Sequence, residues 1–282
     1  MDLALKAIDH KNYTDFANYL ESVSGIALSL GKEYLLEMRL RPLFRQLNIH
    51  SMQDMITRAK SDRRVLALMI DALTTNETSW FRDRYPFSHL QKIIFPALIK
   101  QGASRINCWS AACSSGQEPY SIAMVFEEMR RNFPCTTSLN ILATEISDSM
   151  LEEAKKGCYS ERAIARGLSE DLKNRYLQPC SNSWQVVPKV RQGIRFQKFN
   201  LVHGQELASL GQFDVIFCRN VLIYFTTQVK TRVLTRLASS LKTGGYLMLG
   251  SSEYVSLDLP YFITEKLSPG FVFRRTAVPV KR

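Results

Sequence analysis

Residues 105–126 constrain the fold of this chain more than any other segment. An apolar run at 106–109 leads into small side chains at 110–116, and an amphipathic run follows at 119–126. This order predicts a buried strand, a tight turn and a helix. Small residues in such a turn let the backbone approach a ligand and aim the free N–H groups of the helix start at it. A nucleotide-like cofactor suits this turn, and a purely structural tight turn is the alternative.

The rhythm of strand and helix continues to the end of the chain. We expect strands at 106–110, 139–144, 194–199, 213–218, 246–250 and 271–274, and helices near 118–131, 148–156 and 227–241. This alternation predicts an α/β fold with a doubly wound, mostly parallel sheet that has helices on both faces. Residues 178–193 interrupt it with proline, serine and asparagine around Trp184. We expect a short inserted β-hairpin there, with a plain long loop as the alternative.

The pattern of the N-terminal part of the chain predicts helices only. Apolar residues recur every three or four positions in four segments, as at Val65, Met69, Ile70 and Leu73. We therefore predict a helical N-terminal domain at 1–73, a linker at 74–83, and an α/β domain at 84–282 that carries the inserted hairpin.

The charge of the chain predicts an acidic partner. The 282 residues carry a formal net charge of +11. Nucleic acid, a membrane surface and an acidic protein all fit that sign. Basic residues concentrate in the helical region, which indicates either a docking surface or a solvated helical face: Arg39, Arg41, Arg45, Arg58, Lys60, Arg63 and Arg64.

Cysteine and histidine usage indicates a reducing compartment and no metal. The six cysteines form no Cys-x-x-Cys pair, and the four histidines lack metal-ligand spacing. Residues 1–10 lack the core of a signal peptide, and no apolar run approaches the roughly 20 residues that span a bilayer. We expect a cytoplasmic protein.

Polar residues follow several predicted strands, where a cofactor would lie. Glu145 follows the strand at 139–144, and an acid at that position can accept ribose hydroxyls; a solvated acid is the alternative. Arg219 and Asn220 follow the strand at 213–218, and Tyr224 lies one turn later. The turn itself has one glycine, Gly116, rather than the three of a dinucleotide fingerprint. A cofactor without a pyrophosphate, such as S-adenosylmethionine, fits this turn better.

The linker combines cap residues with two aromatic residues and an arginine. Thr78, Ser79 and Phe81 could form a capping box with a hydrophobic staple. Capping leaves Arg82 unexplained, which suggests that the linker carries part of a site.

Four segments together resemble one family, the chemotaxis receptor protein-glutamate O-methyltransferases of the CheR type. They read TNETSWFRD (75–83), WSAACSSGQEPYSIA (109–123), ATEIS (143–147) and FDVIFCRNVLIYF (213–225), and GYLMLGSSE (245–253) is a weaker fifth match. Their order and spacing agree from about residue 12 to 275. The resemblance implies a class I S-adenosylmethionine-dependent methyltransferase domain with a Rossmann-like sheet, joined to an all-helical N-terminal domain and a small inserted β subdomain.

The resemblance also implies the reaction and the partner. The enzyme would methylate glutamates on the cytoplasmic domain of chemoreceptors and release S-adenosylhomocysteine. It would be a monomer that binds no nucleic acid and does not insert into the membrane. The hairpin turn is short and lacks glycine, so we expect a member that does not need a tethering peptide at the receptor's C-terminus. A nucleic-acid methyltransferase and a catalytically silent cofactor sensor are the alternatives.

Residue roles follow from the same resemblance. Glu118 would bind the methionine ammonium, Glu145 would hold the ribose, and Asn200 and Leu201 would flank the adenine. The other residues implied to contact the cofactor are Asn76, Thr78, Arg82, Ala112, Gly116, Arg219 and Asn220.

Two residues are implied to be catalytic. Arg82 would orient the substrate carboxylate, and Tyr224 would share that task or lie against the sulfonium. The family more often has Asp where Glu145 stands, and the extra methylene of Glu145 keeps the carboxylate but shifts its reach toward the two ribose hydroxyls.

Overall fold

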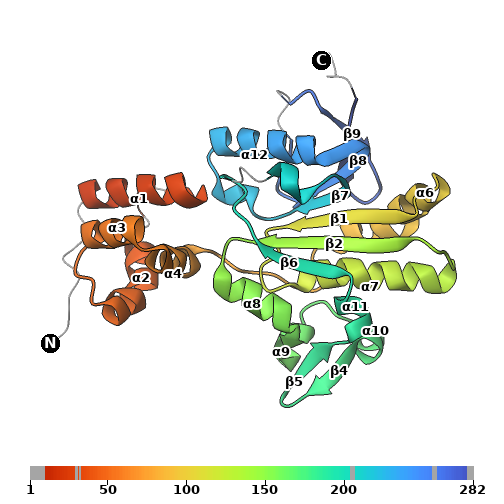
Figure 1. The fold of residues 1–282 in the computed structure, drawn as a ribbon, viewed down its shortest axis with the longest axis horizontal. Coiled ribbons are helices and arrows are strands. Elements are labelled where there is room, and N and C mark those ends of the chain that lie inside the picture. Colours follow the sequence, from red (N-terminus) through yellow and green to blue (C-terminus); the bar gives the residue numbers. More distant parts are fainter. Residues whose placement is uncertain (1–9, 29–30, 32, 204–206, 256–258, 278–282) are drawn as a thin grey trace.

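A computed structural model describes residues 10–28, 31, 33–203, 207–255 and 259–277. It contains a helical domain at the N-terminal end, a large α/β domain and a small second sheet (Figure 1). The segment 1–9, most of the stretch that lacks a signal-peptide core, lies outside the described residues. Within the described ranges, no helix is both long and apolar enough to cross a membrane.

Over its described residues, the helical domain has the four expected helices. These are α1 (His10–Ser24), α2 (Glu33–Leu47), α3 (Met52–Ser61) and α4 (Arg63–Leu73). The Ser51 side chain caps α3 by accepting from the Asp54 amide. The Asp62 side chain caps α4 by accepting from the Arg64 amide. The apolar face of each helix turns into one shared core that includes Phe16, Leu40 and Met69.

The central sheet is mostly parallel. Its strand order is β6-β2-β1-β7-β8-β10-β9. The neighbouring pairs from β6 to β8 are parallel, and β10 is antiparallel to both of its neighbours, β8 and β9. The strands are β1 (Arg105–Ala111), β2 (Ser138–Glu145), β6 (Ile194–Lys198), β7 (Phe213–Cys218), β8 (Leu241–Leu249), β9 (Phe262–Lys266) and β10 (Phe271–Arg275). The strand order reverses between β1 and β7, which makes their carboxyl ends the expected ligand site.

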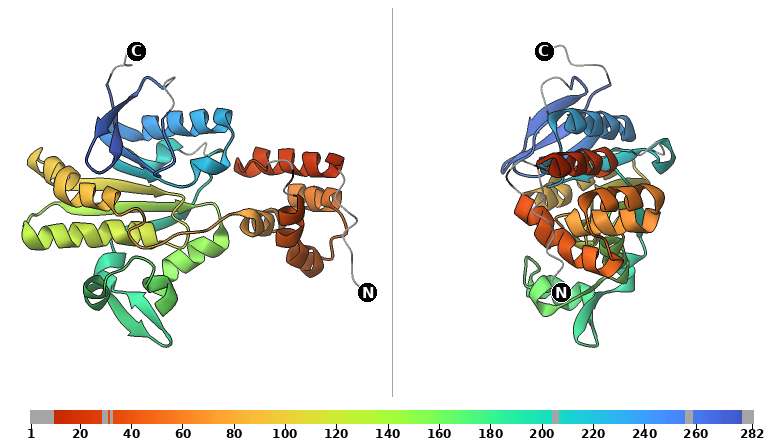
Figure 2. Two further views of the ribbon diagram at one scale, coloured as in Figure 1. Left: turned by 180° about the vertical axis from the view of Figure 1, so that it is seen from behind. Right: turned by 90° about the vertical axis from the view of Figure 1, so that its left-hand side faces the viewer.

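Helices cover both faces of this sheet and create two cores. The helices are α5 (Tyr85–His89), α6 (Phe95–Lys100), α7 (Gln117–Asn132), α8 (Asp148–Lys156) and α12 (Thr227–Ser240), with a short π-helix at Leu90–Ile94. One core contains Tyr120 and Phe217, and the other contains Trp109 and Leu237. This arrangement confirms the predicted fold class. Figure 2 shows the helical domain beyond one end of the sheet, the end to which the β1 and β2 carboxyl ends point.

The predicted hairpin is part of a larger inserted subdomain. Strands β4 (Leu177–Cys180) and β5 (Ser183–Val186) form the hairpin, so the plain-loop alternative is wrong. A two-residue strand, β3 (Cys158–Tyr159), completes a three-stranded antiparallel sheet with order β3-β5-β4. The short helices α9 (Glu161–Ile164), α10 (Glu170–Tyr176) and α11 (Pro188–Arg191) belong to the same insertion.

Candidate cofactor and active site

A cavity of about 250 Å³ lies between the helical domain and the carboxyl ends of β1, β2, β6 and β7. The helical domain contributes Ile26, Leu28 and Leu36 to its wall. All of the predicted site residues except Gly116 line it: Asn76, Thr78, Arg82, Ala112, Glu118, Glu145, Asn200, Leu201, Arg219, Asn220 and Tyr224. The fold thus gathers side chains that lie up to 148 positions apart in the sequence, from Asn76 to Tyr224.

Gly116 has a different setting from the one predicted. It begins α7 with a φ of +96°, a conformation that favours glycine. An added Cβ would lie 2.9 Å from the Ala154 side chain and 3.1 Å from the Tyr159 hydroxyl. Gly116 therefore allows α7 to begin against α8, and it does not line the cavity.

Glu145 is a buried carboxylate that closes two turns. One oxygen accepts from the Ser114 amide at 2.8 Å, and the other accepts from the Ile146 and Ser147 amides at 2.7 and 3.0 Å. Burial raises the pKa of Glu145, and the three amide donors oppose that shift. A carboxylate has roughly four acceptor positions. Three are filled from within the chain, which leaves room for one ribose hydroxyl rather than two.

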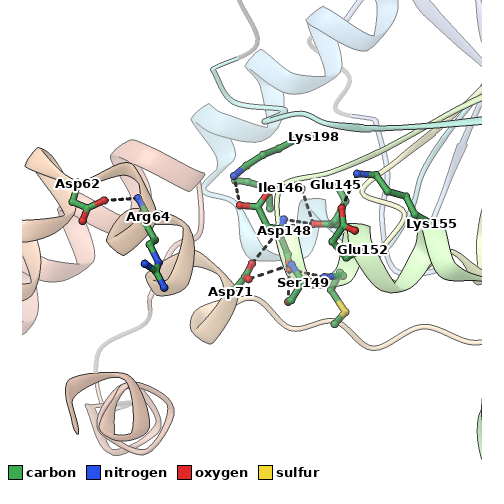
Figure 3. Close-up of polar contacts among 12 residues, drawn as sticks. Asp62, Arg64, Asp71, Glu145, Ile146, Asp148, Ser149, Glu152, Lys155 and Lys198 are labelled. Atoms are coloured by element: carbon green, nitrogen blue, oxygen red, sulfur yellow. Dashed lines mark hydrogen bonds and ion pairs between the residues drawn. The ribbon is translucent and has the colours of Figure 1, made fainter. Parts of the chain in front are cut away.

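Asp71 of the helical domain caps α8 beside Glu145. Figure 3 shows its carboxylate between the backbone amides of Asp148 and Ser149, at 3.1 and 3.2 Å. Lys198 pairs with the Asp148 side chain at 2.6 Å on the other side. The helical domain therefore holds the turn that carries Glu145. No sequence signal indicated this contact, because Asp71 resembles any polar residue of an amphipathic helix.

Arg219 joins three parts of the site. Its guanidinium donates to Glu118 at 3.0 Å, and to the Asp83 carboxylate and the Arg82 carbonyl at 2.7 Å each. Its side chain is 2% exposed. Ser110 also donates to Glu118 at 2.7 Å. Burial raises the pKa of Glu118, and Arg219 opposes that shift. The buried cation thus positions Glu118 and the linker together.

Glu253 orders the loop that follows β7, a role that the sequence reading missed. Its buried carboxylate accepts from the backbone amides of Asn220, Leu222 and Gly250 at 2.8, 2.8 and 2.7 Å. Asn220 has a φ of +57°, so this loop is held in a left-handed conformation. The signal was weak, because one acid at the end of the fifth matching segment resembles a solvated side chain.

The C-terminal end of α1 closes the cavity. The Asn200 side-chain amide donates to the Val23 carbonyl at 2.8 Å, and its oxygen accepts from the Val202 amide at 2.9 Å. The backbone of Ala27 donates to the Tyr224 carbonyl at 2.8 Å. The side chain of Asn200 is therefore held against the helical domain, which fixes its orientation at the cavity wall.

The linker runs along the cavity without forming a helix. Arg82 donates to the Glu77 carbonyl at 2.8 Å, and Ser114 donates to the Asn76 carbonyl at 3.0 Å. The helix that follows begins at Tyr85 without a side-chain cap, so the capping-box alternative is wrong.

Arg39 and Arg58 of the helical domain donate hydrogen bonds to backbone carbonyls. Arg39 also lines the cavity, and its guanidinium donates to the Leu73 carbonyl at 2.9 Å. Arg58 donates to the Leu47 carbonyl at 2.9 Å. These two side chains hold the helical domain together, and they do not form part of a free docking surface.

Comparisons with known families and proteins agree over nearly the whole chain. The all-alpha domain of the CheR methyltransferases matches residues 11–74, and their SAM binding domain matches residues 76–269. Chemotaxis protein methyltransferase Cher2 of Pseudomonas putida is 42% identical over 269 residues, which cover 93% of this chain and 97% of that protein. Chemotaxis protein methyltransferase 1 of Pseudomonas aeruginosa is 42% identical over 264 residues, covering 92% and 96%. A chemotaxis protein methyltransferase of Vibrio parahaemolyticus is 40% identical over 271 residues, covering 95% and 98%.

Proposed function

This chain belongs to the CheR methyltransferase family, and from that premise we propose that it methylates glutamate side chains of chemoreceptors. The methyl donor is S-adenosyl-L-methionine, and the products are a glutamate methyl ester and S-adenosyl-L-homocysteine. The observation that carries the proposal is the cavity, where Glu118 and Glu145 lie together with Arg82 and Tyr224.

The lining of the cavity fits this cofactor. The carboxylates of Glu118 and Glu145 suit an ammonium group and a ribose hydroxyl, and Phe199 and Leu201 offer an apolar wall for adenine. We assign Glu118 to the ammonium and Glu145 to one ribose hydroxyl. When bound, the cofactor supplies a methyl group on a positively charged sulfur.

The acceptor needs no general base. A glutamate side chain has a pKa near ~4.3 and is ionised at neutral pH. A carboxylate oxygen forms the new C–O bond while the C–S bond breaks and its electron pair stays on sulfur, so no proton moves. The chain must exclude water and align the reacting atoms at roughly 3–3.5 Å.

Arg82 and Tyr224 supply that alignment in our proposal. A guanidinium matches the geometry of a carboxylate. Arg82 uses one of its N–H groups for the Glu77 carbonyl, which holds the side chain at the edge of the cavity. The face of the Tyr224 ring favours positive charge and suits a position near the sulfonium.

The helical domain, residues 1–73, is proposed to dock on the receptor. Tyr34 and Met38 are exposed on α2 at 65% and 60%, one helical turn apart. Arg41 and Arg45 continue this exposed face. Charge reversal at Arg41 should slow methylation more at low salt than at high salt. A rate change independent of salt would argue against docking by charge.

A methyl-transfer assay with two acceptors tests the function. The protein is incubated with labelled S-adenosylmethionine and either a chemoreceptor cytoplasmic fragment or RNA. We expect base-labile methyl esters on the receptor, and a gain of ~14 Da per modified site from replacing a proton by a methyl group. Label on RNA would support a nucleic-acid methyltransferase, and label on neither would support a cofactor sensor.

Arg82→Ala tests the assignment of the acceptor side. It should reduce turnover far more than affinity for S-adenosylhomocysteine, measured by calorimetry. Equal losses of both would place Arg82 on the cofactor instead.

Three further features are proposed on chemical grounds. All six cysteines are free thiols, which is typical of a reducing compartment such as the cytoplasm. The chain would act as a monomer. The β4–β5 hairpin closes through Ser181 and Asn182 alone, which supports activity without a receptor tether. Deleting the last five residues of the receptor should then leave the methylation rate unchanged.

A further inference from the structure

The end of the linker is held in a strained backbone conformation. Phe81, Asp83 and Arg84 have φ values of 49°, 65° and 52°, in the left-handed region that side chains other than glycine rarely adopt. Strain of this kind persists only where the surroundings enforce it, and it concentrates at functional segments.

Neighbouring elements enforce this conformation. The Trp80 amide donates to the Arg166 carbonyl at 3.1 Å, and the Phe81 amide donates to the Ser121 hydroxyl at 3.2 Å. At Gly167 an added Cβ would lie 2.1 Å from the Trp80 carbonyl oxygen, so only glycine allows the two backbones to meet. The strained segment is therefore fixed from two sides.

The fixed segment forms one wall of an open groove. The groove has a volume of about 520 Å³ and lies between residues 79–84 and the Arg166–Gly167 backbone. Ser79 and Arg82 line both this groove and the cofactor cavity. A protein chain that places a side chain beside Arg82 would thus continue into the groove.

The groove presents positive charge to solvent. Arg82, Arg84 and Arg166 line it, while the Asp83 carboxylate is turned inward onto buried Arg219 at 2.7 Å. Within the described part of the chain, the guanidinium of exposed Arg84 makes no hydrogen bond or ion pair.

Glu77 lies beside the groove and opposes this charge, although it does not line the groove. It pairs with Arg166 at 2.8 Å, but the two side chains are 65% and 52% exposed. Ion pairs this exposed contribute little, so Arg166 can exchange Glu77 for another carboxylate.

We propose that this groove binds an acidic segment of the substrate protein next to the acceptor glutamate, with Arg84 and Arg166 receiving a second carboxylate. The inference rests on the proposed function, because the acceptor carboxylate lies at Arg82. A receptor segment fits better than a nucleic acid, since the occupant must be continuous with a glutamate side chain. The groove would select which glutamates are methylated by the acidity of their neighbours.

Charge reversal at Arg84 tests the inference, with Arg105→Glu as the matched control. Arg105 is also exposed but begins β1, about 20 Å of strand away from the cavity. The probe is a purified chemoreceptor cytoplasmic fragment. We expect Arg84→Glu to lower kcat/KM about 3- to 10-fold at low salt and less at high salt, with kcat at saturation within about twofold. Arg105→Glu should match the wild type.

A binding measurement separates this inference from the proposed function. Affinity of the receptor fragment for the protein loaded with S-adenosylhomocysteine is measured without turnover. If the wild type methylates the receptor, and the Arg84→Glu and Arg105→Glu variants have equal rates and equal affinities, the groove proposal is wrong and the proposed function stands. If the wild type does not methylate the receptor fragment but binds it, and Arg84→Glu weakens that binding, the proposed function is wrong and the groove proposal stands.

Folding of the variants is checked by affinity for S-adenosylhomocysteine. Should Arg84→Glu lose that affinity, Arg84→Gly removes the charge and suits the left-handed backbone. Arg166→Gln is the second arm and should lower kcat/KM in the same salt-dependent way. If neither variant differs from the control, the groove does not bind the substrate.

Discussion

Replacing Glu253 with glutamine should destabilise the chain and slow methyl transfer together. One Glu253 oxygen accepts from Asn220 and Gly250, and the other accepts from Leu222. Glutamine keeps one acceptor oxygen and places an NH₂ group where the second oxygen stood. At least one buried amide then faces a donor instead of an acceptor.

The magnitude follows from these three bonds. A buried amide left without an acceptor costs about 1–3 kcal/mol, and the other two bonds each lose about 1 kcal/mol when the acceptor is no longer charged. We therefore expect Glu253→Gln to lower the free energy of unfolding by about 3–5 kcal/mol. The loop carrying Asn220 and Tyr224 should loosen, so kcat should fall in the population that stays folded.

Urea unfolding measures the first effect, with Glu265→Gln as the control. Glu265 pairs with Arg274 on a partly exposed surface and should change the free energy of unfolding by about 1 kcal/mol or less. Initial rates of receptor methylation measure the second effect, under conditions where both variants are folded. Equal unfolding free energies for the two variants, or an unchanged kcat for Glu253→Gln, would refute the ordering role of Glu253.

Other predictions test the packing and charge of the site. Gly167→Ala should lower the free energy of unfolding by about 3 kcal/mol or more, because its Cβ would overlap the Trp80 carbonyl; a drop under 1 kcal/mol in urea unfolding would contradict it. Asp71→Ala should lower that free energy by about 1–2 kcal/mol and raise the KM for S-adenosylmethionine, because the Asp148 and Ser149 amides at the start of α8 lose their acceptor; an unchanged KM would limit Asp71 to a stabilising role. Because the pKa of Glu145 is raised, the stability it contributes is complete below about pH 4.5 and is lost as the pH rises through the raised pKa. Glu145→Gln should therefore reduce the loss of unfolding free energy as the pH rises from about 4.5 through the raised pKa. If the variant and the wild type lose unfolding free energy equally with pH, Glu145 is not the cause of that loss.

Local patterns were enough to predict the elements that are buried or capped. All six residues of β7 are buried, and the sequence at 213–218 is a matching apolar run. The bounds of α8 agree with those predicted, because Ser147 caps its start and Gly157 adopts a φ of +61° after its end. Strong local signals of this kind do not depend on distant parts of the chain.

Elements and contacts that depend on distant partners could not be predicted. β9 is an edge strand whose exposed residues include Ile263, so it lacks a clear apolar run. β8 begins at Leu241 rather than 246, because pairing with Phe213 extends it beyond the apolar segment. The capping of α8 by Asp71 joins residues 77 positions apart. No local pattern at either residue encodes such a contact.

The hydrogen bonds of the cavity distinguish Arg82 from Arg219, which the sequence alone could not do. Arg219 is buried and paired with Glu118 and Asp83, so its charge is already neutralised, and breaking these pairs would leave a buried guanidinium without a partner. The Arg82 guanidinium makes one hydrogen bond within the described residues, to a backbone carbonyl, and it lies between the cavity and the groove. A second carboxylate can bind Arg82 without breaking an ion pair. In our proposal Arg82 therefore receives the acceptor glutamate, while Arg219 keeps Glu118 and the linker in position for it.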